Sequence, residues 1–165
     1  MRFNLVDRIL DVEGSQRIRA VKYLPLREEY LADHFPRFPV MPGVLMLQSL
    51  VEAGAWLLRI AEDFRHSVIV LREARNVKYG TFMDPGRVMA ITVEKAEEVT
   101  GPEGPLVSFK GKGDVNGSAT VSARFTLARY SLKDRNPDLQ AVDERIVANL
   151  RSHCRILRGE LDRAS

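Results

Sequence analysis

The feature that most constrains this chain is a long apolar segment that follows a proline. The segment runs from Val44 to Phe64 behind Pro42, and its apolar residues cover most of the circumference of a helix. A proline loses no needed hydrogen bond at a helix start, so we expect the helix to begin at Pro42-Gly43. A helix that is apolar on nearly every side must be wrapped by other structure. The sequence therefore predicts one central, buried helix.

A membrane span is the alternative for such a segment. Gln48, Glu52 and Arg59 interrupt the apolar run. The uncharged stretches between them fall short of the about 20 residues that a bilayer requires. We therefore expect the helix to be covered by protein and expect no membrane partner.

Strand-like alternation precedes and follows this helix. Asn116-Gly117 is a strong signal for a two-residue hairpin turn, because both central positions of a type I′ turn need positive φ. One buried helix with a meander of strands predicts an α+β fold, an antiparallel sheet wrapped around a long central helix. The expected strands, separated by Gly and Pro turns, cover residues 16–23, 67–71, 74–80, 87–96, 105–113 and 118–130.

Two further segments lie outside this pattern. Residues 25–39 carry three prolines and are expected to form a structured loop, extended or turned rather than helical. Asn136-Pro137-Asp138 is a helix start, and apolar residues follow it at steps of three or four. We expect residues 1–130 to form one domain and residues 131–165 a C-terminal helical extension. The apolar stripe of that extension is predicted to pack on the body or on a partner subunit.

Composition limits the classes of function. The 25 basic and 22 acidic residues are interleaved, and a net charge of +3 does not favour nucleic-acid binding. One cysteine, Cys154, and three scattered histidines offer neither an internal disulfide nor a Cys/His metal cluster, so we expect no metal. Charges every few residues near Met1 argue against a secretory leader. We expect a cytoplasmic protein.

The stretch His34-Phe35-Pro36-Arg37-Phe38-Pro39-Val40-Met41-Pro42-Gly43-Val44-Leu45 carries a specific resemblance. With Leu5–Ile9, Ala74–Tyr79 and Asp84-Pro85-Gly86, it resembles the hot-dog-fold 3-hydroxyacyl-[acyl-carrier-protein] dehydratases, the FabZ/FabA-like family, over residues 5–130. The resemblance implies a hot-dog fold and a lyase of fatty acid biosynthesis. Such an enzyme removes water from a (3R)-3-hydroxyacyl thioester, carried by acyl carrier protein or coenzyme A, and needs no cofactor.

The resemblance assigns roles to positions of this sequence. His34 would remove the α-proton, and a histidine is a suitable base because its ordinary pKa lies near working pH. The backbone N–H of Gly43, at the helix N-terminus, would polarise the thioester carbonyl. A histidine bonded to backbone and a tight loop-to-helix junction are the structural alternatives for these two residues. The substrate-binding positions implied are Phe35, Pro42, Val44 and Leu47.

One departure from the family pattern concerns the acid. Fourteen residues after His34 the family has a carboxylate, and this chain has Gln48, whose carboxamide cannot shuttle a proton. Glu52 lies one helical turn further, about 6 Å along the axis, and offers a carboxylate at a displaced position. Gln48 and Glu52 are both candidate catalytic residues. The structural alternative for Glu52 is pairing with Arg or Tyr across a subunit interface.

Three functions remain open at this point. The first is a dehydratase or hydratase that uses His34, Gly43 and either Gln48 or Glu52. The second is a non-catalytic hot-dog protein that binds acyl thioesters, and the third is a thioesterase, because a fold alone does not decide the chemistry. The family site forms between two subunits, so the resemblance implies a homodimer or a trimer of dimers. Exposed sheet edges favour such pairing on physical grounds.

Overall fold

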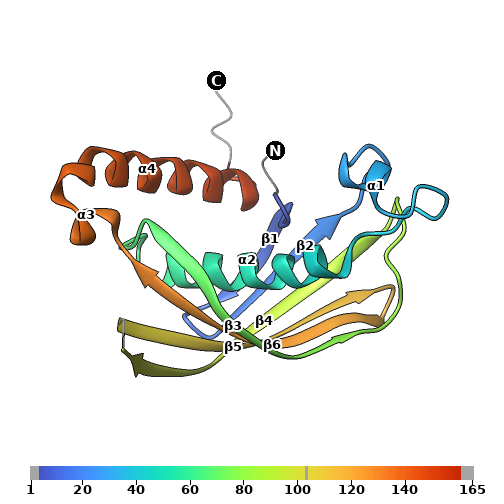
Figure 1. The fold of residues 1–165 in the computed structure, drawn as a ribbon, viewed down its shortest axis with the longest axis horizontal. Coiled ribbons are helices and arrows are strands. Elements are labelled where there is room, and N and C mark those ends of the chain that lie inside the picture. Colours follow the sequence, from blue (N-terminus) through green and yellow to red (C-terminus); the bar gives the residue numbers. More distant parts are fainter. Residues whose placement is uncertain (1–3, 103, 161–165) are drawn as a thin grey trace.

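A six-stranded antiparallel sheet curls around one long helix (Figure 1) in the computed structural model, which describes residues 4–102 and 104–160. The strand order is β1-β2-β4-β5-β6-β3, so β1 and β3 form the two edges. This confirms the predicted α+β hot-dog architecture. The strands are β1 (Arg8–Glu13), β2 (Arg17–Tyr23), β3 (Val68–Tyr79), β4 (Val88–Gly101), β5 (Gly104–Val115) and β6 (Ser118–Tyr130).

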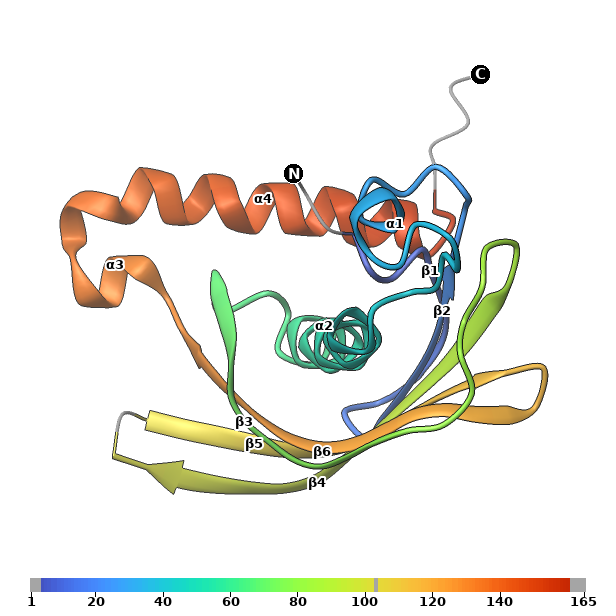
Figure 2. The same cartoon turned by 45° about the vertical axis from the view of Figure 1, so that its right-hand side comes forward.

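The helices lie on the concave side of the sheet. Figure 2 shows α2 nearly end-on inside the curl, with α1 and α4 above it. The helices are α1 (Tyr30–Asp33), α2 (Gly43–Ala61), α3 (Leu132–Arg135) and α4 (Gln140–Leu157), with a single 3₁₀ turn, η1 (Pro137–Leu139), before α4.

The centre of α2 packs closely on the sheet. A Cβ on Gly54 would lie 2.9 Å from Cε2 of Phe125, so only glycine lets this ring sit against the helix. The Phe125 ring stacks on Phe109 with 5.4 Å between the centroids, and both are buried. Burying aromatic rings of this size is a large hydrophobic contribution. The middle of α2 is therefore a solid core.

The expectation that this helix is too short to span a membrane is wrong. Among the described residues, α2 is long and apolar enough to cross a bilayer. More than half of it is buried within the protein itself, as in the core helix of a soluble fold. Burial by the sheet, rather than length, accounts for its apolar character.

The helix is also shorter than predicted. It begins at Gly43, as expected, but it ends at Ala61 rather than at Phe64. Asp63 and Phe64 have φ of +49° and +57°, and the left-handed conformation of these two residues stops the helix.

The strands differ from the prediction mainly in length. The segments 67–71 and 74–80 form one strand, β3, whose pairing with β6 shifts in register on both sides of residues 73–75. The β4–β5 hairpin extends to Gly101 and Gly104, beyond its predicted ends. The turn at Asn116-Gly117 is confirmed, because both residues have positive φ, +50° and +78°.

The proline-rich loop contains one element that the sequence did not predict. Residues 30–33 form the one-turn helix α1, between Pro25 and Pro36. The prolines exclude a longer helix, but the residues between them are free to make a single turn.

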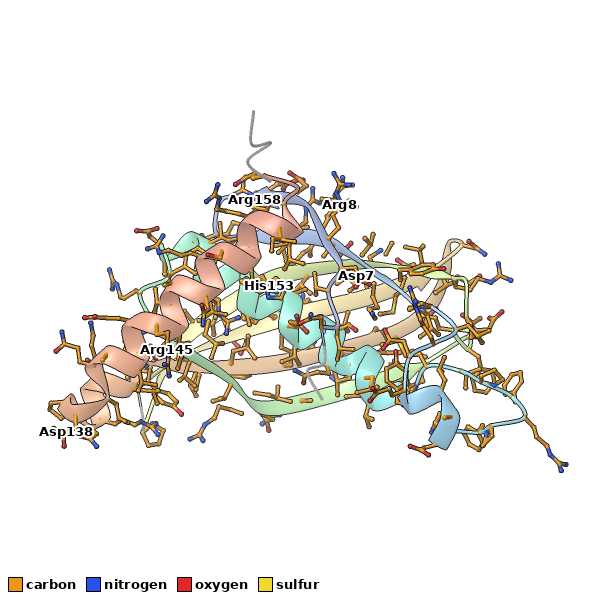
Figure 3. The ribbon with its side chains drawn as sticks, turned by 90° about the horizontal axis from the view of Figure 1, so that it is seen from above. Asp7, Arg8, Asp138, Arg145, His153 and Arg158 are labelled. Carbon is orange, nitrogen blue, oxygen red and sulfur yellow. The ribbon has the colours of Figure 1, made fainter. Side chains whose placement is uncertain are left out.

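The C-terminal extension forms the predicted amphipathic helix and packs on the body. The Asn136 side chain accepts a hydrogen bond from the N–H of Asp138 at 3.0 Å and so starts the tail. From above, α4 and the N-terminal segment lie over α2 (Figure 3). Cys154 and Leu157 are buried there, and the His153 ring contacts Trp56 of α2, with centroids 5.4 Å apart.

Candidate active site

The loop at His34 and the first turn of α2 enclose a cavity of about 270 Å³. Most of its wall is apolar. Three predicted site residues, His34, Phe35 and Gly43, line it together. The full lining is His34, Phe35, Val40, Met41, Gly43, Met46, Tyr79, Gly80, Thr81, Phe82 and Thr120.

His34 follows directly after α1 and is half-buried. Its backbone N–H donates to the carbonyl of Tyr30 at 3.0 Å, which closes the turn. Its ring meets the edge of Phe35, with 4.5 Å between centroids. Phe35 has a φ of +50°, an unfavourable conformation for a residue with a side chain. Such strain persists only where the surrounding structure imposes it, and it is common at functional sites.

Gly43 is the first residue of α2. The carbonyl of Pro42 accepts from the N–H groups of Leu45 and Met46 at 2.9 and 3.1 Å, and this begins the helix. The N–H of Gly43 precedes these bonds and has no partner within the helix. The positive end of the helix dipole therefore lies at the cavity wall, where it can stabilise an oxyanion.

Tyr79 supplies a second reason for glycine at this position. A Cβ on Gly43 would lie 2.9 Å from Cε1 of Tyr79, so the phenol ring packs directly on the helix start. Burial raises the pKa of the Tyr79 hydroxyl, so it stays protonated near neutral pH. Only hydrogen at the Cα of Gly43 leaves room for this contact.

The far wall of the cavity was missed by the sequence interpretation. It consists of Tyr79–Phe82 at the end of β3, together with Thr120 of β6. The hydroxyls of Thr81 and Thr120 lie 3.1 Å apart in a hydrogen bond, and Thr120 is fully buried. The resemblance drew attention to Ala74–Tyr79 and Asp84-Pro85-Gly86 on either side. The segment between these two stretches, residues 80–83, was the sequence signal that could have located this wall.

Other predicted residues lie outside this cavity. Val44 and Gln48, one turn apart on α2, are exposed, and 69% of Val44 is accessible. Leu47 is half-buried, and Pro42 caps the helix without lining the cavity. A single chain therefore does not bring Gln48 to His34. The face of α2 that carries Val44 and Gln48 points outward.

Glu52 is turned toward the N-terminal segment. Its carboxylate accepts a hydrogen bond from the backbone N–H of Leu5 at 3.0 Å. Burial raises the pKa of Glu52, while the Leu5 N–H, Trp56, Arg59 and Lys22 act in the opposite direction. Glu52 thus has a hydrogen-bond partner within its own chain, the backbone of Leu5.

Arg59 and His153, both half-buried, are further polar residues on that side of α2. Burial lowers the pKa of the Arg59 guanidinium to about 10, and the Glu52 carboxylate partly offsets this. Burial and Arg59 both lower the pKa of His153. Among the described residues, no group of three His, Cys, Asp or Glu side chains could hold a metal ion.

Comparison with known proteins identifies the relatives of this chain. Residues 1–124 match the family model of the FabA-like domain. The 3-hydroxyacyl-[acyl-carrier-protein] dehydratase FabZ of Geobacillus thermodenitrificans is 32% identical over 126 residues, 76% of this chain and 84% of that protein. The FabZ of Albidiferax ferrireducens is 35% identical over 129 residues, 76% of this chain and 83% of that protein.

Solved structures show the same fold at lower identity. The dehydratase heterocomplex ApeI:P from Xenorhabdus doucetiae superposes with a TM-score of 0.64 at 16% identity, over 82% of this chain and 89% of that chain. The smu.793 protein of Streptococcus mutans, bound to acetyl CoA, gives 0.56 at 10% identity, over 78% and 92%. Because the family model covers the central helix and the sheet up to the middle of β6, and the FabZ relatives span three quarters of the sequence, this chain belongs to the FabA-like family of hot-dog-fold proteins.

Proposed function

We propose that this protein interconverts (3R)-3-hydroxyacyl and trans-2-enoyl thioesters, as a dehydratase of fatty acid biosynthesis. The observation that carries the proposal is the apolar cavity in which His34 faces the first turn of α2. Relatives named 3-hydroxyacyl-[acyl-carrier-protein] dehydratase, at about a third identity, support the same reaction. We place the protein in the cytoplasm, where carrier-bound acyl groups are made.

The site supplies two of the three parts that such a reaction needs. The imidazole of His34 accepts the α-proton as the C2–H bond breaks. The N–H of Gly43 and the helix dipole stabilise the enolate oxygen that forms on the thioester carbonyl. The electron pair of the enolate then expels the 3-hydroxyl group. Protonation of that leaving hydroxyl is the third part.

We infer that protonation of the leaving hydroxyl group involves a second subunit. Gln48 lies on the exposed face of α2, and β3 is an unpaired edge of the sheet in a single chain. Val70 and Leu71 on β3 are partly exposed at 37% and 39%. We propose a homodimer in which two β3 edges pair and the outer face of each α2 approaches the cavity of the partner. A trimer of such dimers would use the same sites.

The choice of acid follows from the hydrogen bonds of α2. Glu52 is held by the Leu5 N–H and is half-buried beneath the N-terminal segment. We infer that Glu52 is structural and that Gln48 holds the hydroxyl group or a water by hydrogen bonds. Acid–base assistance contributes about 10²–10⁴-fold, so dehydration that lacks a carboxylic acid is slow. An acyl-thioester-binding protein without turnover is the second candidate, and Gln48 is the observation that favours it.

The test is spectrophotometric turnover of crotonyl and 3-hydroxybutyryl thioesters, on coenzyme A and on acyl carrier protein. We expect slow turnover by the wild type, loss in His34→Ala and a gain in Gln48→Glu of about 10²-fold. Glu52→Gln should leave the rate per folded protein unchanged. Loss of turnover in Glu52→Gln, with the fold intact, would return the acid role to Glu52.

Two results would replace the proposal. Thioester hydrolysis without hydration would indicate a thioesterase. Binding of crotonyl thioesters without turnover in the wild type, and without gain in Gln48→Glu, would indicate the non-catalytic candidate.

A further inference from the structure

A buried lysine lies outside the site described above, at the base of the loop that carries His34. Lys22 of β2 is 2% exposed. Its ammonium lies 3.2 Å from Oδ2 of Asp7 and 3.2 Å from Oε1 of Glu28. A buried charge must be paired, because leaving water is costly for an unpartnered ammonium. The two carboxylates satisfy that requirement from two different segments.

The two partners of Lys22 lie on different segments, one that leads into β1 and one that leads into α1 and His34. Asp7 precedes β1, and its carboxylate also accepts from the N–H of Tyr23 at 2.6 Å. In Figure 3 it lies on the N-terminal segment above the sheet. Glu28 precedes α1, and its carbonyl accepts from the N–H of Leu31 at 3.0 Å. The Lys22–Glu28 pair therefore ties the sheet to the turn that leads into His34.

Tyr30 shares these surroundings. Burial raises the pKa of its phenol, and the carboxylates of Glu28 and Asp7 raise it further. The carbonyl of Tyr30 in turn accepts from the N–H of His34. A short path of contacts thus runs from Lys22 through Glu28 and α1 to the proposed base.

The His34 loop needs such an anchor because it is strained and exposed. Phe35 has positive φ, and 61% of its surface is accessible. The downstream end of the loop is fixed where the N–H of Met41 donates to the carbonyl of Met83 at 2.9 Å and Met41 is buried. On the upstream side, Leu24 and Leu31 are buried, and the N–H of Leu24 donates to the carbonyl of Arg87 at 3.0 Å. The Lys22–Glu28 ion pair adds a further anchor to the segment between these two leucines.

We propose that Lys22, through Glu28, is a positioning residue that holds His34 at the cavity. The inference rests on the proposed function of His34 as base. A displacement of about 1 Å at a reacting group can cost 10²-fold in rate, so a loosened loop would slow turnover without removing any group that touches substrate.

Asp7 and Glu28 provide a matched pair of variants. Each places one carboxylate oxygen 3.2 Å from the same ammonium, but only Glu28 leads into the loop. Glu28→Gln and Asp7→Asn each remove one charge beside Lys22 and keep an amide in its place. A purely structural ion-pair cluster predicts similar effects for both. A positioning role predicts that they differ.

The experiment combines hydrogen exchange with turnover on the full chain. We expect amide exchange in peptides covering residues 30–38 to speed up at least about tenfold in Glu28→Gln and to stay within about twofold in Asp7→Asn. The kcat of Glu28→Gln on crotonyl thioester should fall about 10- to 100-fold, while Asp7→Asn stays near the wild type. Lys22→Met, where it folds, should resemble Glu28→Gln.

Three results would decide against the proposal. Unchanged loop exchange in Glu28→Gln overturns it, and so does equal loosening in Asp7→Asn. A loosened loop with wild-type turnover overturns it as well. A wild type without turnover contradicts the proposed function instead, and the exchange comparison then still tests whether Lys22 anchors the loop.

Discussion

The two ends of α2 are surrounded by different kinds of structure. At the N-terminal end, a strained loop and the end of β3 enclose a cavity of about 270 Å³, and the exposed aromatic rings of Phe35 and Phe82 line it. At the C-terminal end, α4 lies above the helix (Figure 1), and Arg151 of α4 donates to the side chain of Asp63, just after α2. We therefore expect substitutions at the N-terminal end of α2 to change activity and substitutions at its C-terminal end to change stability.

The C-terminal end shows how this stability is built. Asp143 of α4 is 2% exposed and accepts from the hydroxyl of Ser67 and from the N–H of Leu132. Arg151 donates to the side chain of Asp63 at 2.8 Å and to its carbonyl at 2.7 Å. The contacts with Ser67 and Asp63 join the C-terminal extension to the start of β3 and the end of α2, whereas the contact with Leu132 lies within the extension. None of these residues lines the cavity.

His34→Ala is expected to have the largest effect, and it tests whether activity depends on the N-terminal end of α2. Because the imidazole is the proposed base, we expect turnover of crotonyl thioesters to fall about 10²–10⁴-fold. The melting temperature should change little, since His34 is half-buried in a loop. His153→Ala is the matched control at the other end of α2, and it should keep wild-type turnover. Equal losses in both variants would break the separation.

Gly43→Ala is expected to have the next largest effect. The new Cβ would lie 2.9 Å from the Tyr79 ring, so the ring, which lines the cavity, must shift. We expect about a tenfold loss in kcat/KM, in line with the cost of small misplacements at a reacting centre. Gly43→Ala combined with Tyr79→Leu relieves the contact and should recover substrate binding. No change in either variant would contradict the close packing at the helix start.

Asp143→Ala tests the opposite end. The substitution leaves the Ser67 hydroxyl without its buried acceptor and removes one of the two acceptors of the Leu132 N–H, which costs about 1–3 kcal/mol of unfolding free energy. Urea unfolding measures this loss. Turnover per folded protein should stay at the wild-type level. A loss of turnover at full stability would show that α4 influences the site.

The free energy of unfolding should also depend on pH through the carboxylate of Asp143. Burial raises the pKa of Asp143, but the hydrogen bonds from Ser67, Leu132 and Lys133 outweigh this and lower it overall. A lowered folded-state pKa gives stability that is complete above the unfolded value of about 3.9 and is lost as the pH falls through the folded-state pKa. In a plot of the urea unfolding midpoint against pH, the fall at low pH, the acid limb, should therefore be less steep in Asp143→Asn than in the wild type. An unchanged acid limb would contradict the shift.

Arg151→Ala should have the smallest effect. The Arg151–Asp63 pair is exposed, and exposed ion pairs contribute little because water and salt screen them. We expect unchanged turnover and a melting temperature within about 2 °C of the wild type. A large drop would show that α4 depends on this pair rather than on its buried contacts.

Features that depend only on the residues of a single segment could be predicted from the sequence. The turn at Asn116-Gly117 needs positive φ at both residues, and the start of α2 needs the Pro42-Gly43 junction. Both features were predicted and are present. The loop that joins His34 to Gly43 was located because its prolines and its histidine stand together in one stretch.

Features that depend on distant segments were missed for a physical reason. The Tyr79–Phe82 wall faces Gly43 only because β3 pairs with β6 and curls over α2. The partner of Glu52 is the backbone of Leu5, a residue 47 positions away whose N–H carries no side-chain signature. Lys22 gave no sequence signal, since a basic residue in a strand ordinarily faces solvent.

The central claim is that a thioester oxygen binds at the Gly43 N–H beside His34. The most direct test is amide NMR of uniformly ¹⁵N-labelled protein titrated with butyryl thioester, which lacks the 3-hydroxyl group and does not react. The account predicts that the Gly43 amide proton moves downfield on binding, together with shifts in the His34 ring. Saturable binding that leaves both the Gly43 amide and the His34 ring unmoved would contradict it.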